Sequence, residues 1–140
     1  MPSAMIKKEK FRSLVDAAKK ARKHAYSPYS GVKIGAAVLC SDGKIFSGAN
    51  IENSSYGLSC CAERTAIFKA VSEGARDLVA IAVVGKSEEF TRPCGACRQV
   101  MVEFNLKMKV LRRGVDGFSA DETAGSLLPS PFNPPELSGK

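Results

Sequence analysis

The sequence of 140 residues contains no tryptophan, a single histidine and no long apolar run. Because a helix that crosses a bilayer needs about 18 or more consecutive apolar residues, no membrane-spanning segment is expected. Residues 1–10 also lack the apolar core of a secretory signal. The only histidine, His24, stands at the end of a basic stretch, where a surface or capping role is expected. These absences exclude a site built on several histidines.

Cysteine and positive charge are both well represented. Five cysteines without a secretory signal favour a reducing compartment, so we expect a cytoplasmic protein that uses thiols for metal binding or chemistry. The net charge of +7 would suit a nucleic-acid partner. Much of this charge, however, lies within residues 7–23, where the solvent face of a helix accounts for it better. The length suits one domain, expected to cover residues 1–140.

Hydrophobic spacing predicts alternating helices and strands. An Asp-Gly turn between two short strand-like runs predicts a hairpin, and a continuous apolar run further on predicts a buried strand. This order predicts an α/β fold with three α/β/α layers around a mixed sheet of about five strands. The predicted helices cover residues 8–24, 61–73, 94–104 and 123–128, and the strands cover residues 32–40, 44–49, 79–84, 107–111 and an edge strand near Phe118.

The most informative stretch is Cys61-Ala62-Glu63-Arg64, followed further along the chain by Pro93-Cys94-Gly95-Ala96-Cys97. Alone, the Cys-x-x-Cys pair is compatible with half of a structural zinc site, a redox pair or coincidence. With Cys61 there are three thiols, the number of protein ligands that a catalytic zinc uses while its fourth position stays open for water. Both segments fall at predicted helix starts, where free N–H groups and the helix dipole favour thiolates.

Three polar neighbours suit such a site. In isolation, Glu63 would be a first-turn residue that complements the helix dipole, but beside three thiols it is favoured as a proton shuttle. Three thiolates around Zn²⁺ leave a net charge of about −1, which nearby donors would offset. Arg64 follows Cys61 by three residues, on the same helical face, and is a candidate donor to its sulfur. Gln99, two residues after Cys97, is a second candidate donor.

Together these motifs resemble the small, homotetrameric, zinc-dependent cytidine deaminases of pyrimidine salvage. The resemblance implies one zinc per subunit on Cys61, Cys94 and Cys97, Glu63 as the acid and base, and a base contact from the Ala62 backbone. It further implies hydrolytic deamination of cytidine and deoxycytidine to uridine and deoxyuridine by zinc-activated hydroxide, with release of ammonia. The segments that carry it are residues 26–37, 50–56, 61–66, 93–99 and 127–132.

The resemblance also implies the remaining substrate contacts. Asn50 and Glu52 would bind the ribose hydroxyls. Tyr56 would help to form the site of a neighbouring subunit, and Phe132 would close over the base there. Val32 stands where many relatives carry an aromatic that packs on the nucleoside, and it offers less stacking area.

Three functions stay open on the residues alone. The first is a deaminase of free nucleosides, and the second is a deaminase of a modified nucleoside or of a base within a polynucleotide. The charge of +7 supports the second, whereas the ribose-type loop at residues 50–53 and the lack of tryptophan oppose it. The third is a structural zinc module, which would need a fourth ligand, and Cys60 is the nearest thiol. A nucleic-acid or membrane partner is therefore not expected.

Overall fold

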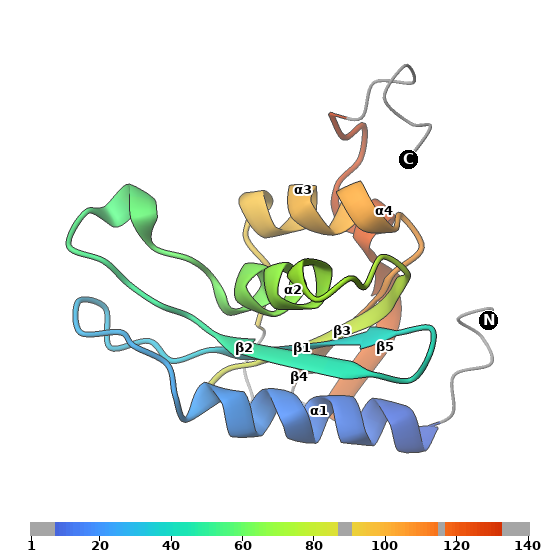
Figure 1. Ribbon diagram of the computed structural model, residues 1–140, viewed down its shortest axis with the longest axis horizontal. Coiled ribbons are helices and arrows are strands. Elements are labelled where there is room, and N and C mark those ends of the chain that lie inside the picture. Colours follow the sequence, from blue (N-terminus) through green and yellow to red (C-terminus); the bar gives the residue numbers. More distant parts are fainter. Residues whose placement is uncertain (1–7, 87–90, 115–116, 133–140) are drawn as a thin grey trace.

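The computed structural model describes residues 8–86, 91–114 and 117–132. One mixed sheet has the strand order β2-β1-β3-β4-β5, with α1 on one face and α2, α3 and α4 on the other (Figure 1). This confirms the predicted three-layer α/β/α fold with five strands. The elements are α1 (Lys8–Arg22), β1 (Gly35–Cys40), β2 (Ile45–Ala49), the 3-10 helix η2 (Tyr56–Leu58), α2 (Ala62–Ser72), β3 (Leu78–Val84), α3 (Gly95–Phe104), β4 (Lys109–Gly114), β5 (Gly117–Thr123) and α4 (Ala124–Leu127).

The centre of the sheet is its most deeply buried part. β1 pairs antiparallel with β2 and β3, β3 runs parallel to β4, and β4 pairs antiparallel with β5. Every residue of β1 and β3 is buried, because helices cover both faces of these strands. None of the helices within the described residues is both long enough and apolar enough to span a membrane.

Several predicted boundaries move by a few residues for local reasons. β1 begins at Gly35 rather than at residue 32, because the Asn50 side chain takes the place of a strand partner there. Its amide donates to the Val32 carbonyl at 2.8 Å, and its Oδ1 accepts from the Ile34 N–H at 2.8 Å. β4 begins at Lys109 rather than at residue 107, where the Lys107 N–H donates to Asn105 Oδ1 at 2.9 Å.

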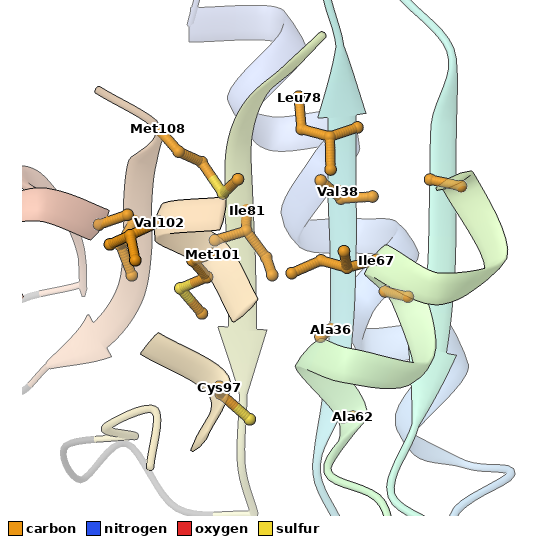
Figure 2. Close-up of a cluster of buried hydrophobic side chains, with 14 of the residues drawn as sticks. Ala36, Val38, Ala62, Ile67, Leu78, Ile81, Cys97, Met101, Val102 and Met108 are labelled. Atoms are coloured by element: carbon orange, nitrogen blue, oxygen red, sulfur yellow. The ribbon is translucent and has the colours of Figure 1, made fainter. Parts of the chain in front are cut away.

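Two apolar layers flank the sheet. Successive residues of a strand face opposite sides, so Ala36, Val38 and Cys40 pack beneath α2 and α3, and the intervening residues pack against α1. Cys40 is therefore a small buried hydrophobe of this layer. Figure 2 shows the first layer, with Ile81 between Ile67 and Met101 and with Cys97 at one end. Cys97 belongs to this core, which thereby anchors part of the cysteine cluster.

Gly35 marks a close approach between α1 and β1. A Cβ atom at Gly35 would lie 2.0 Å from the Ala18 carbonyl oxygen and 2.6 Å from the Arg22 backbone nitrogen. Because α1 would have to shift, we expect Gly35→Ala to lower the free energy of unfolding by about 1–3 kcal/mol in urea denaturation. Gly57→Ala is the control, since its Cβ would meet nothing within 4 Å. If both variants lose the same free energy of unfolding, the close approach of α1 to Gly35 adds no cost of its own.

Candidate metal and catalytic site

The cysteine motifs stand at two helix N-termini. Cys61 is the N-cap of α2 and Cys94 is the N-cap of α3, both in extended backbone conformation. The Cys97 N–H donates to Cys94 Sγ at 3.4 Å, so a free helix-end donor already stabilises negative charge on that sulfur. Arg98 holds the residue that precedes Cys94, because its Nε donates to the Pro93 carbonyl at 2.8 Å.

The three sulfur atoms converge on one point. Cys94 Sγ lies 3.7 Å from Cys61 Sγ and 3.4 Å from Cys97 Sγ, and all three lie within 4.8 Å of one another. In a tetrahedral site with Zn–S bonds of about 2.3 Å, two sulfurs stand about 3.8 Å apart, so this cluster fits zinc. Among the described residues no fourth histidine, cysteine, aspartate or glutamate joins it. Three protein ligands leave one coordination position for a small molecule, which disfavours a closed structural site.

The protonation of the thiols depends on their mutual contacts. Hydrogen bonds from Cys97 and Arg64 lower the pKa of Cys61 to about 5. The pKa of Cys97 is raised, first by its hydrogen bond to the Cys61 thiolate and then by burial. In the absence of a cation, the cluster therefore concentrates negative charge on Cys61. Zinc binding displaces the remaining thiol protons, since only thiolates coordinate it.

Arg64 is the cation that faces this charge. Its Nη2 donates to Cys61 Sγ at 3.3 Å, one helical turn along α2, and this hydrogen bond raises the pKa of the guanidinium. Arg64 Nε is buried and has no partner within the described residues. The contact places Arg64 where the sequence predicted a donor to sulfur.

We expect Arg64→Ala to fold and to bind zinc about 10–100-fold more weakly, because a donor that offsets the thiolate charge is lost. Competition with a chromogenic chelator measures this affinity. Lys69→Ala, an exposed change on the same helix, should bind zinc like the wild-type protein. Unchanged affinity in Arg64→Ala would contradict the role.

Glu63 occupies the first turn of α2 and is almost completely buried, with 4% of its surface exposed. Burial, with a smaller contribution from the nearby Cys61 charge, raises the pKa of its carboxyl to about 7. Such a carboxyl can both accept and donate a proton near neutral pH. A zinc ion on the neighbouring sulfurs would act in the opposite direction and favour the ionised form.

A cleft of about 350 Å³ opens beside Glu63. It brings together most of the residues that the sequence nominated for substrate and metal, from the loop before β1, the end of β2 and the starts of α2 and α3. These are Val32, Asn50, Glu52, Cys61, Ala62, Glu63 and Cys94. Four further lining residues were not singled out from the sequence, namely Ser30, Ile34, Thr91 and Arg92. In the sequence, these four residues are marked only by their closeness to residues that were singled out. Ser30 and Ile34 flank Val32, and Thr91 and Arg92 precede Pro93.

Three nominated residues lie elsewhere. Tyr56 is 75% exposed and packs edge-on against Tyr29, with 5.9 Å between ring centroids, and Phe132 is 77% exposed. Neither lines the cleft of its own chain. The Gln99 amide donates to the Phe132 carbonyl at 2.8 Å, not to a site sulfur. The predicted donation of Gln99 to a site sulfur therefore stays a prediction, and residues two apart on a helix, such as Cys97 and Gln99, point to different sides.

The fold and the site together define a zinc hydrolase. Three thiolate ligands leave a coordination position free, and a buried carboxyl whose pKa is raised by burial lies beside them. Zinc in such a site acts as a Lewis acid that activates water near neutral pH.

Comparison with known proteins narrows this class. The family model for the cytidine and deoxycytidylate deaminase zinc-binding region matches residues 8–112. The cytidine deaminases of Sporosarcina psychrophila and Halalkalibacterium halodurans are each 50% identical to the chain, over 126 and 125 residues. Both alignments cover 89% of this chain, together with 93% and 95% of the respective relatives.

Solved structures agree. A crystal structure of cytidine deaminase from Burkholderia pseudomallei is 48% identical, with a TM-score of 0.80, and the match covers 86% of this chain and 98% of that one. The cytidine deaminase of Mycobacterium tuberculosis is 36% identical, with a TM-score of 0.76 and coverage of 89% and 98%. The chain therefore belongs to the cytidine and deoxycytidylate deaminase family.

Proposed function

We propose that this protein deaminates free cytidine and deoxycytidine to uridine and deoxyuridine, with release of ammonia, within pyrimidine salvage. The observation that carries the proposal is the position of Glu63, buried beside three converging sulfurs in a cleft that Asn50 and Glu52 also line. Relatives that are 50% identical and named cytidine deaminases support it. The predicted cytoplasmic location and single domain over residues 1–140 remain part of this proposal.

The residues divide the chemistry as follows. Cys61, Cys94 and Cys97 would hold zinc, which would supply the Lewis acidity that activates water. Glu63 accepts the proton of the attacking water, delivers it to a ring nitrogen of cytosine, and later protonates the leaving amine. Its burial keeps bulk water from competing for these protons. The Ala62 backbone orients the base against Glu63.

The sugar end of the cleft distinguishes a free nucleoside from a polynucleotide. The Glu52 carboxylate and the Asn50 amide present polar groups that suit ribose hydroxyls. The basic helix α1 lies on the sheet face opposite α2 and α3, which carry the cysteine motifs (Figure 1). Apart from Arg22, whose Nε donates to the Lys33 carbonyl beside the cleft, the positive charge of α1 lies across the sheet from the cysteine motifs. Nucleic acid is therefore not proposed as a partner.

One assay tests the function. Zinc-loaded protein, with one zinc bound per chain, should convert cytidine to uridine. The reaction is measured by the loss of cytidine absorbance and by the release of ammonia. Removing zinc with a chelator should abolish turnover, and adding zinc back should restore it. Zinc-loaded protein that releases no ammonia from cytidine would instead support a structural zinc module.

We further propose that the protein is a homotetramer whose active sites are shared between subunits. Two large aromatic side chains, Tyr56 and Phe132, are 75% and 77% exposed in the isolated chain, which suits burial against another copy. The resemblance described above assigns both residues to a neighbouring site. Phe132 would then close over the base, and its backbone carbonyl, held by Gln99, fixes where that side chain starts.

Mixing two inactive chains tests the sharing. A Glu63→Ala chain lacks the proton carrier of its own site, and a Phe132→Ala chain lacks the ring that it lends. When the two are unfolded and refolded together, some sites combine an intact Glu63 with a borrowed Phe132, so activity should exceed the sum of the separate variants. If native mass measurement confirms mixed tetramers and activity stays at that sum, Phe132 serves its own subunit.

A further inference from the structure

The Glu52 carboxylate is held by three donors from one short turn. Its Oε1 accepts from the Tyr29 N–H at 3.0 Å and from the Ser30 N–H at 3.1 Å. Its Oε2 accepts from the Ser30 hydroxyl at 2.5 Å. Within the described residues, Ser30 is the only side chain that donates to this carboxylate. The same hydrogen bond is the main cause that lowers the pKa of Glu52, so the group is ionised at neutral pH.

The Ser30 hydroxyl is itself fixed by a second contact. Its Oγ accepts from the Val32 N–H at 3.0 Å, across a turn in which Gly31 has a φ of 73°. Glycine adopts this left-handed conformation without strain. Oγ thus accepts one hydrogen bond, from the Val32 N–H, and donates its single proton to Glu52.

The donor count leaves one open position on the carboxylate. An ionised carboxylate offers about four acceptor sites, two on each oxygen. Two backbone N–H groups fill Oε1, and Ser30 fills one site of Oε2. The remaining site, on Oε2, can accept one hydrogen bond from a ligand. A sugar hydroxyl supplies such a donor, whereas a phosphate at the same position would bring an acceptor and a like charge.

We propose that Ser30 is a positioning residue, whose hydroxyl holds the free acceptor site of Glu52 toward one hydroxyl of the nucleoside sugar. The inference rests on the proposed function and extends it to a residue that touches neither the base nor the metal. The same loop also holds the Asn50 side chain, which donates to the Val32 carbonyl and accepts from the Ile34 N–H. The loop at residues 29–34 thus orients both sugar-binding side chains.

Three substitutions test the role through a split between KM and kcat. Ser30→Ala should raise the KM for cytidine about tenfold, with kcat within about twofold of wild type, since one hydrogen bond to a charged group is lost. Ser30→Thr retains the hydroxyl and should restore most of the affinity. Ser72→Ala, at the exposed end of α2, is the matched control and should behave like wild type. Zinc content and melting temperature should be unchanged in all three.

A substrate without the hydroxyls separates positioning from general damage. The ratio of kcat/KM between wild type and Ser30→Ala should fall to about one with 2′,3′-dideoxycytidine, and also with cytidine in a Glu52→Ala background. Equal losses on both nucleosides, or additive losses with Glu52→Ala, would overturn the role of Ser30, as would an unchanged KM. Wild-type protein that turns over neither nucleoside would overturn the proposed function, and the inference with it. The wild-type measurement therefore tells the two failures apart.

Discussion

Glu63→Gln should fold and bind zinc like the wild-type protein, yet lose nearly all deaminase activity. The amide is nearly isosteric with the carboxyl, so the packing of this buried residue is retained. It cannot accept or return a proton, however, and general acid–base catalysis alone is worth roughly 10²–10⁴-fold in rate. Steady-state turnover of cytidine, measured beside zinc content and thermal unfolding, separates the chemical effect from misfolding.

Glu73→Gln provides the matched control at the opposite end of the same helix. Glu73 is the exposed C-cap residue of α2, so the same change of carboxyl to amide should leave turnover unaffected. If Glu63→Gln retains a tenth or more of wild-type turnover, Glu63 is not the proton carrier. The carboxyl that performs this role would then have to come from elsewhere, and Glu52 also lines the same cleft.

Replacing any one of Cys61, Cys94 and Cys97 with alanine should abolish stable zinc binding and lower the melting temperature. The three sulfurs join the starts of α2 and α3, so the metal links elements that are distant in sequence. Zinc binding to structural peptide sites is worth roughly 10–16 kcal/mol, and losing one of three thiolates forfeits much of such an affinity. Metal analysis of purified variants and thermal unfolding with and without added zinc measure both effects.

The three variants should differ once zinc has been removed from all proteins. Cys97 is completely buried in the core beneath α3, whereas Cys94 is exposed. Cys97→Ala should therefore destabilise the metal-free protein as well, while Cys94→Ala should leave its stability close to that of the metal-free wild type. Equal metal-free stability would show that the core tolerates the loss of the sulfur.

Cys60→Ala is the control for the metal ligands. Cys60 adjoins Cys61, but its backbone pairs with Ile51, and within the described residues its thiol is not part of the sulfur cluster. The variant should keep its zinc and its melting temperature. Zinc lost from Cys60→Ala and retained by Cys61→Ala would reverse the assignment.

Much of the fold was predictable because local rules were not in conflict. Alternating short strands and amphipathic helices predicted the three layers, and the continuous apolar run now seen as β3 predicted a buried strand. Boundaries were less accurate where a side chain replaced a backbone partner. The Asn50 side chain forms hydrogen bonds with the backbone of Val32 and Ile34, so β1 begins after these residues. The spacing of apolar residues does not indicate this contact.

The sequence by itself determined the chemistry of this protein, because the residue types and short spacings of its two cysteine motifs allow few alternatives. Thiolates at helix starts, a carboxyl beside them and an arginine one turn away are local features, and the chain places them accordingly. Only the tertiary structure decided which distant residues meet. It brought the sulfurs of Cys61 and Cys94 together at the starts of two helices, and it placed the Gln99 amide against the Phe132 carbonyl. It also bound Ser30 to Glu52, because this pairing depends on how the loop before β1 lies against the end of β2, which no local pattern records.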